Sequence, residues 1–256
     1  MVYLYFLIGL LASVIGALAG FGGGVFMKPI LDFLGHYPVA TIGVLSSTTV
    51  LTMSIVSLWT RRREVKEMNK TEAVLLAVGA VLGGIIGKGI FTSLLDYAWV
   101  GAVQTSLLIL IFAAVLFYVQ FKDKFPSYHI KDKRLMLAMG LLLGLLAAFL
   151  DIGGGPHNVA LLSLFFAMNA KQAGLISIFI IFFSQMSSLS LTFITADLSS
   201  YDLTMLPAMM VGGVLGGAIG SGLSKLLSVR SVEVIFKVVI SGLLLLNIYN
   251  LYTYLN

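Results

Sequence analysis

Charged residues are absent from long stretches of this chain, and these stretches predict helices that cross a membrane. No Asp, Glu, Lys or Arg occurs in five runs, residues 1–27, 33–60, 97–121, 172–196 and 203–224. Each run reaches the ~20 residues that an α-helix needs to span a bilayer. We expect further helices near residues 72–92 and 98–120, which cross the membrane and return between the two charged loops at 61–70 and 122–134.

Two short apolar segments interrupt this pattern, and each follows three consecutive glycines. The segments are residues 25–36 and 156–168, and the helices before the glycines are expected near residues 2–20 and 135–151. A dozen residues is too few for a perpendicular span, so each segment is predicted to be re-entrant or half of a broken helix. The predicted fold class is therefore all-α, a polytopic helical membrane protein.

The chain repeats itself. Gly22, Gly23 and Gly24 recur 131 positions later as Gly153, Gly154 and Gly155, and at the same offset Gly43 matches Gly174 and Ser46 matches Ser177. The stretch "GAVLGGIIGK" (79–88) likewise resembles "GGVLGGAIGS" (212–221). We therefore expect a first repeat at 1–121, a basic cytoplasmic linker at 122–134 and a second repeat at 135–256, forming one integrated membrane domain.

Composition agrees with a membrane protein, because 59% of the residues are hydrophobic and 11% are charged, with a mean hydropathy of +1.03. The net charge of +5 comes largely from the loops 61–70 and 122–134. Short basic loops stay in the cytoplasm, so this pattern indicates topology rather than nucleic-acid binding. We expect a multi-pass protein of the cytoplasmic (inner) membrane, whose first apolar stretch, with no basic residue ahead of it, is a span and not a signal peptide.

The charges leave two arrangements of the repeats open. The loop 196–202 carries two acids and no base, whereas 224–230 carries Lys225 and Arg230. If the first loop is outside and the second inside, an odd number of crossings separates residues 134 and 196, and the repeats are inverted. The alternative is four crossings in each half with parallel repeats. We favour inverted repeats, which commonly hold substrate at their interface.

Three glycines in a row weaken a helix by about 1 kcal/mol each relative to alanine. Unwound backbone in a membrane is tolerated where it is buried in protein or lines a wet cavity. The amides that it frees, at the start of the next half-helix, can bind an anion. The alternative is that small residues allow close helix packing, which is our interpretation of 79–88 and 212–221 but not of the two triplets.

Polar residues are densest beside the triplets, which favours function there. Lys28, Asp32 and His36 are spaced to share one helix face, although Lys28 and Asp32 could instead neutralise each other. Asp151 is a candidate proton carrier, or alternatively a boundary or capping residue. The predicted substrate ligands are the two glycine triplets with Lys28, Ser46, Ser47, His157, Asn158 and Ser177, and the predicted proton-coupling residues are Asp151, Asp32 and His36.

The stretches "GFGGGVFMKPIL" and "IGVLSS", echoed by "DIGGGPHNVALL" and "AGLIS", resemble the duplicated glycine signature of the TauE/SafE family of sulfite exporters and sulfonate permeases. The resemblance covers both halves and implies transport of sulfite, sulfoacetate or related sulfonates. It implies site elements at both triplets and at Pro29. Lys28, His157 and Asn158 stand where the family usually has apolar residues, and Ala160 replaces the second proline, so this site is unusually polar.

We therefore expect a secondary transporter for a small organic or sulfur-containing anion, working by alternating access with possible proton coupling. An anion channel with a glycine-lined filter is the alternative. An enzyme is not expected, because no HExxH or GxSxG motif occurs, and the absence of GxxxxGK[ST] argues against an ATP-driven motor. With no cysteine, no metal motif and no cofactor motif, the expected partners are the anion, protons and lipid, without nucleic acid.

Overall fold

The computed structural model describes residues 1–97, 99–195 and 197–255, and within these residues the protein is helical without strands. Two residues at the edges of expected segments lie outside the described residues: residue 98, where a helix is expected to begin, and residue 256, where the second repeat is expected to end. The predicted all-α class is confirmed. The α-helices are α1 (Val2–Ala19), α2 (Gly24–Leu34), α3 (Val39–Thr60), α4 (Arg62–Glu67), α5 (Lys70–Leu94), α6 (Val100–Gln120), α7 (Lys133–Phe149), α8 (Pro156–Phe166), α9 (Ala170–Thr195), α10 (Leu206–Leu226) and α11 (Val229–Leu255).

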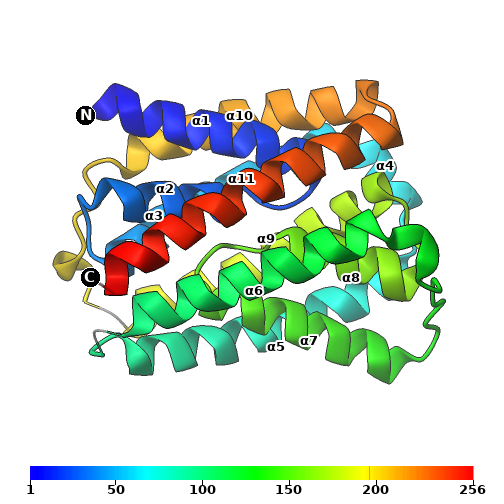
Figure 1. Ribbon diagram of the computed structural model, residues 1–256, viewed down its shortest axis with the longest axis horizontal. Helices are drawn as coiled ribbons and strands as arrows, with labels where there is room; N and C mark the ends of the chain where they lie inside the picture. The colour runs from blue at the N-terminus through cyan, green and yellow to red at the C-terminus, as the bar shows by residue number, and fades with distance from the viewer. Residues whose placement is uncertain (98, 196, 256) are drawn as a thin grey trace.

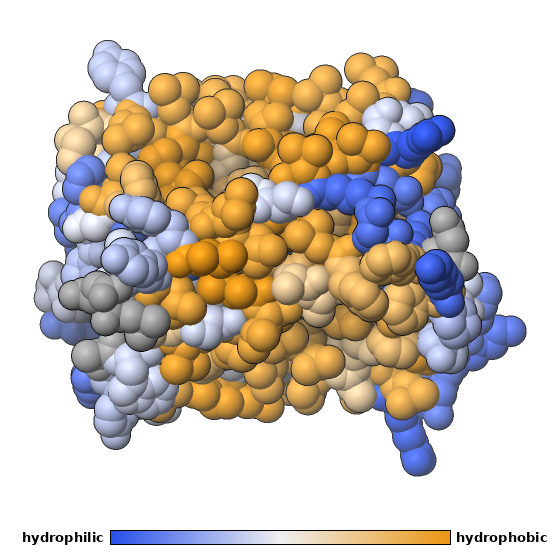
Figure 2. All heavy atoms as spheres, viewed as in Figure 1, coloured by the Kyte–Doolittle hydropathy of each residue, from blue (hydrophilic) through white to orange (hydrophobic). Residues whose placement is uncertain are grey.

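Among the described residues, seven helices are long and apolar enough to cross a membrane, namely α1, α3, α5, α6, α9, α10 and α11. They lie roughly parallel in Figure 1. Figure 2 shows their outer surface as a broad hydrophobic belt between two hydrophilic ends. Large apolar side chains such as Leu110, Val238 and Leu245 are 66–69% exposed on it. Lipid must cover such a surface, because soluble monomers rarely expose apolar patches of this extent.

The two hydrophilic ends differ in charge. The loops around α4, between α6 and α7 and between α10 and α11 lie together at the right of Figure 1 and carry most of the surface Lys and Arg residues. The loops after α5 and α9, with Asp96, Asp197 and Asp202, lie at the opposite end with both chain ends. We name these ends the basic side and the acidic side. Lys28 and Lys88 belong to neither side, since both are buried within the apolar belt.

The first glycine triplet breaks the chain where expected, since α1 stops at Ala19 and α2 starts at Gly24. α2 has 11 residues, and at ~1.5 Å per residue it cannot cross the ~30 Å hydrocarbon core. It turns back, because the Tyr5 hydroxyl near the start of α1 lies 2.9 Å from Nδ1 of His36, just beyond α2. The α1–α2 pair therefore opens towards the acidic side.

The second triplet produces the same kind of break between α7, which stops at Phe149, and the 11-residue α8. Here the return is towards the basic side. The backbone amides of Tyr128 and Ile130, in the linker before α7, donate to the carbonyls of Leu164 and Phe165 at the end of α8, at 2.8 and 3.0 Å. The two helical pairs thus open to opposite sides of the membrane.

The two halves are interlocked rather than side by side. α1 packs most extensively along α10, and α7 along α5, so each pairs with a helix of the other half (Figure 1). Glycines make these contacts possible, as expected for residues 79–88 and 212–221. A Cβ on Gly83 would meet the Leu141 carbonyl oxygen, and one on Gly216 would lie 2.5 Å from the Leu10 carbonyl oxygen. Small residues let helix backbones approach in this way.

Gly83→Val is expected to lower the thermal unfolding temperature in detergent by roughly 5 °C, because the new side chain would push α5 away from α7. Gly89→Val is the matched control on the same helix, since a Cβ there meets no atom within 4 Å. Equal unfolding temperatures for the two variants would contradict tight α5–α7 packing.

The basic side is expected to face the cytoplasm, because short loops rich in Lys and Arg are retained there. The chain has no cysteine, so Lys124→Cys and Asp96→Cys each introduce one reactive thiol, on the basic and the acidic side. A membrane-impermeant maleimide added to intact cells should label Asp96→Cys alone. Labelling of Lys124→Cys from outside would reverse the orientation.

Candidate substrate site

The two glycine breaks lie against each other in the interior of the protein. A Cβ on Gly22 would stand 3.6 Å from the Gly153 carbonyl oxygen, and one on Gly24 would collide with the Ile152 carbonyl oxygen. Both Gly22 and Gly153 have positive φ angles, 76° and 72°, which glycine adopts without steric cost. The two unwound segments therefore cover each other, which satisfies the requirement that such backbone be enclosed by protein.

Several backbone amides in these segments are left free. Within the part of the chain that the structure describes, the amides of residues 22–25 and 153–155 donate to no backbone acceptor. The first α2 amides that do donate are those of Phe26 and Met27, both to the Gly23 carbonyl at 3.1 Å. Buried amides without an acceptor carry a large desolvation cost. An anion or water placed between the breaks would offset this cost.

Lys28 reaches this region from α2 with its side chain buried, at 1% exposure. Its Nζ donates to Oε1 of Gln104 on α6 at 2.5 Å, and Gln104 Nε2 donates to the Phe149 carbonyl at the end of α7 at 2.6 Å. Among the described residues, no carboxylate lies within ion-pair distance of Lys28. The ammonium group is therefore held by a neutral amide and has no direct ion-pair partner.

Lys28 and Asp32 thus do not neutralise each other as a direct ion pair. Asp32 is partly buried and lies near Tyr254 at the end of α11. His36 is exposed, and it lies beyond Gly35, where α2 ends in a left-handed turn. The expectation that Lys28, Asp32 and His36 share one helix face therefore fails for His36, which lies at the acidic side.

Asp151 is fully buried and pairs with Lys88 of α5, whose Nζ lies 3.0 Å from Oδ1. Ser47 Oγ on α3 donates to the same oxygen at 3.4 Å, while Oδ2 has no hydrogen-bond partner among the described residues. The Asp151 φ angle of 55° is rare for a non-glycine residue and is typical of functional positions.

The position of Asp151 depends on a glycine of the other half. A Cβ on Gly43 of α3 would collide with Oδ2 of Asp151. At an offset of 131 residues, Gly174 corresponds to Gly43 and Gly20 corresponds to Asp151. This second pair is also in close contact, since a Cβ on Gly20 would collide with Gly174. Gly20 and Asp151 both have left-handed backbone. The repeat thus places Asp151 where the first half has a glycine.

Polar side chains without partners surround the second break. They belong to Ser46 on α3, His157 and Asn158 on α8, and Ser177 and Gln185 on α9, and all are buried. Two of them lie close to the glycines, because a Cβ on Gly154 would stand 3.2 Å from Asn158 Nδ2 and one on Gly153 would stand 3.3 Å from Gln185 Cδ. Buried polar groups are normally hydrogen bonded, so this cluster fits a polar ligand or bound water.

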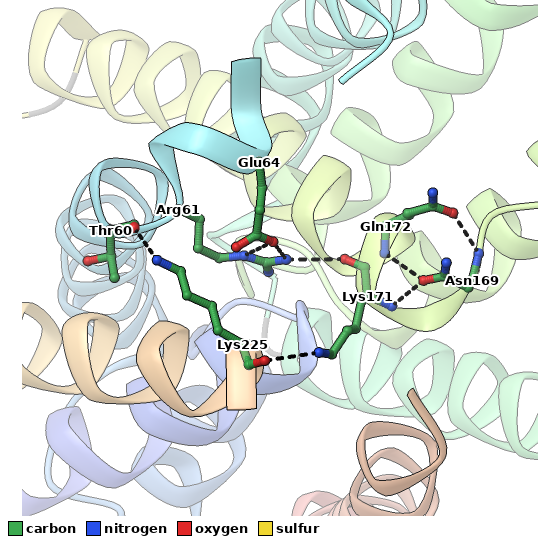
Figure 3. A network of polar contacts seen from close by, with 7 residues as sticks. All are labelled: Thr60, Arg61, Glu64, Asn169, Lys171, Gln172 and Lys225. Atoms are coloured by element: carbon green, nitrogen blue, oxygen red, sulfur yellow. Dashed lines mark hydrogen bonds and ion pairs between the residues drawn. The ribbon is translucent and has the colours of Figure 1, made fainter. Parts of the chain in front are cut away.

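A cavity of ≈ 450 Å³ opens at the basic side, and its lining includes Arg61, Lys171 and the glutamates Glu64, Glu67 and Glu72 and extends along α9 to Ile176. A network of polar contacts holds the surrounding helix ends together (Figure 3). Lys225 donates to the Thr60 carbonyl at 2.7 Å, and Arg61 contacts the Glu64 carboxylate and the Lys171 carbonyl. The cavity itself is lined by residues of α4, α5, α8 and α9.

Sequence reasoning missed two residues of this region. Lys88 is the last residue of the glycine-rich stretch 79–88, which we assigned to close helix packing. An isolated lysine inside an apolar helix is itself a sign of function. Gln185 lies in an apolar run, where polar side chains commonly bond across helices as Gln104 does, but its amide has no partner among the described residues. No group of His, Asp or Glu residues that could hold a metal ion occurs among the described residues.

Comparison with known proteins identifies the family. The profile of the family Sulfite exporter TauE/SafE matches residues 5–247. The chain belongs to the TauE/SafE family. These proteins are membrane transporters, and the probable membrane transporter protein YunE of Bacillus subtilis (strain 168) is 24% identical over 255 residues, covering 91% of this chain and 92% of that protein. The resemblance inferred from the glycine signature is thereby confirmed.

In this TauE/SafE protein, Lys88→Met is expected to lower the free energy of unfolding by about 3–5 kcal/mol, because it leaves the Asp151 carboxylate buried without its partner. Lys88→Met combined with Asp151→Asn removes both charges and should recover most of this loss. Denaturant or thermal unfolding of purified protein measures the cycle. Additive losses in the double variant would show that the two side chains do not form a pair.

Proposed function

We propose that this protein is a secondary transporter that moves a small anion across the cytoplasmic membrane by alternating access. The anion is held between the two glycine breaks, with Lys28 supplying positive charge. The observation that carries this proposal is the buried ammonium group of Lys28, which faces a neutral amide and has no carboxylate within ion-pair distance among the described residues.

Burying an unpaired charge costs several kcal/mol, so a folded protein that retains one needs a reason to keep it. A bound anion would neutralise Lys28 and would also accept from the free amides of residues 22–25 and 153–155. The unpartnered side chains of Ser46, Ser177, His157 and Asn158 supply further hydrogen bonds. Ser47, bonded to Asp151, connects this site to the proposed proton carrier.

Alternating access is supported by the arrangement of the halves. The α1–α2 and α7–α8 pairs open to opposite sides, and α1 and α7 run in opposite directions in Figure 1. The contact between Gly20 and Gly174 corresponds, at an offset of 131 residues, to the contact between Asp151 and Gly43. We infer inverted repeats with the boundaries expected from the sequence. In such transporters one repeat moves against the other around a fixed central site.

The cavity on the basic side is proposed as the cytoplasmic entrance, because it opens at that end and its lining extends along α9, the helix that carries Ser177. Asp151 is proposed as the proton carrier, and Asp32 and His36, which lie progressively nearer the acidic side, as steps on the proton route. We propose sulfite, sulfoacetate or another sulfonate as the cargo, in keeping with the family description. The glycine-lined region is also compatible with an anion channel, for which flux would not saturate.

Proteoliposomes containing the purified protein test the proposal. Uptake of labelled sulfite and a panel of small sulfonates should saturate with concentration and should increase with an imposed pH gradient. Flux that rises linearly with concentration would favour the channel. No uptake of any of these anions would reject sulfur-containing anions as the cargo.

Lys28→Met is expected to reduce uptake at least about tenfold, because the site loses its unbalanced positive charge. The variant should unfold at the same or a higher temperature, since an unpaired buried ammonium is removed. Lys66→Met, which removes one exposed charge from the basic side, is the matched control and should transport normally. Normal uptake by Lys28→Met would remove Lys28 from the mechanism.

A further inference from the structure

Two buried ammonium groups lie against one aromatic ring. Nζ of Lys88 is 4.6 Å from the ring centroid of Phe91, and Nζ of Lys28 is 5.7 Å from the same centroid. Aromatic rings attract cations at this distance, which helps to keep both lysines charged within the membrane. The site described above thus contains two cations, although a single carboxylate, Asp151, is in ion-pair contact with either of them among the described residues.

The partners of the two lysines determine which charge is available. Asp151 Oδ1 is 3.0 Å from Lys88 and forms an ion pair with it, whereas Lys28 is bonded to Gln104 and has no carboxylate within ion-pair distance among the described residues. The site therefore offers one positive charge while Asp151 is ionised. Asp151 Oδ2 accepts no hydrogen bond from the described residues, so it is the oxygen that can take a proton. Protonation would release Lys88 and leave two positive charges.

Few other charged or titratable groups face Asp151. α5 contributes Lys88, α2 contributes Lys28 and Asp32, and α8 contributes His157, while Tyr201 in the acidic-side loop is within electrostatic reach. α3 contributes Ser47 and Gly43, which do not titrate. The carboxylate that directly opposes a lysine here is that of Asp151. Protonation of Asp151 therefore changes the net charge next to the anion site by one unit.

We propose that Lys88 is a second anion ligand that Asp151 masks, so that a divalent oxyanion binds together with one proton whereas a monovalent anion binds to Lys28 with none. This inference rests on the proposed anion site. In the divalent case the proton goes to Oδ2 of Asp151, the Lys88–Asp151 pair separates, and both ammonium groups face the anion. The charge of the cargo thereby decides whether its transport is coupled to protons.

The coupling follows from the cost of an unpaired buried charge. Protonating Asp151 without an anion would leave Lys88 buried and unpaired, and binding a dianion without a proton would leave one negative charge uncompensated. Each ligand therefore favours the other, and by linkage the effect is reciprocal. Affinity for a divalent anion is expected to fall about tenfold for each unit of rising pH, as for any equilibrium that takes up one proton.

Sulfate and methanesulfonate are suitable probes, because near neutral pH the first is divalent and the second monovalent and neither titrates. Isothermal titration calorimetry of the purified wild-type protein, in buffers of different protonation enthalpy, gives the number of protons taken up per anion. We expect about one proton for sulfate and about none for methanesulfonate. Equal proton numbers for both probes, or binding of methanesulfonate alone, would overturn the inference while leaving the anion site intact.

Variants test whether Asp151 takes up the proton and whether Lys88 supplies the second positive charge. Asp151→Asn should bind sulfate without proton uptake and with pH-independent affinity, whereas the control Asp96→Asn, an exposed acidic-side residue, should behave as wild type. The pair Lys88→Met and Asp151→Asn, which replaces both charges, should weaken sulfate binding at least about tenfold and weaken methanesulfonate binding much less.

The failure of the proposed function has a different signature. If neither probe binds, or if both bind equally well to Lys28→Met, the anion site itself is rejected together with this inference. Proton uptake with sulfate that persists in Asp151→Asn would place the proton on another group and would overturn the role of Asp151.

Discussion

Unwound backbone inside a bilayer has to be enclosed by protein, and in this molecule the two glycine breaks enclose each other. Gly22 and Gly24 lie against the carbonyls of Gly153 and Ile152, so neither half could bury its own break alone. The interlocked packing of α1 on α10 and α7 on α5 follows from this constraint, because each half must reach across the other to close the centre. The same contact leaves backbone amides free at the point where the halves meet.

The charges near this contact are arranged unequally. One buried lysine is paired with a carboxylate and the other with an amide, and the cost of the second is not recovered within the described structure. Binding sites commonly retain such costs, because a ligand that removes them binds more tightly. The left-handed backbone of Asp151 belongs to the same group of unfavourable local features. Stability and anion recognition therefore make opposite demands on the same few residues.

The proposed repeat relates glycines and helix breaks in the two halves but not their charged residues. Matching positions provide the breaks, the close contacts of α3 and α9 and the two short returning helices, whereas Lys28, Lys88 and Asp151 have no charged counterparts at the matching positions Val159, Ser221 and Gly20. A symmetric scaffold can move between two equivalent conformations, while an asymmetric set of charges gives it one binding site. This division of roles explains why the glycines recur and the charged residues do not.

The sequence by itself determined the membrane class, the ends of most helices and both breaks, because these depend on local hydropathy and helix length. It also marked Lys28 and Asp151, since a charge within an apolar run is conspicuous. Only the tertiary structure decided that Lys88 pairs with Asp151, 63 positions away, that Gln104 holds Lys28, and that His36 lies apart from the site. These partners are on different helices, and which side chains meet is set by how the helices pack across the two halves, which the local pattern of residues does not encode.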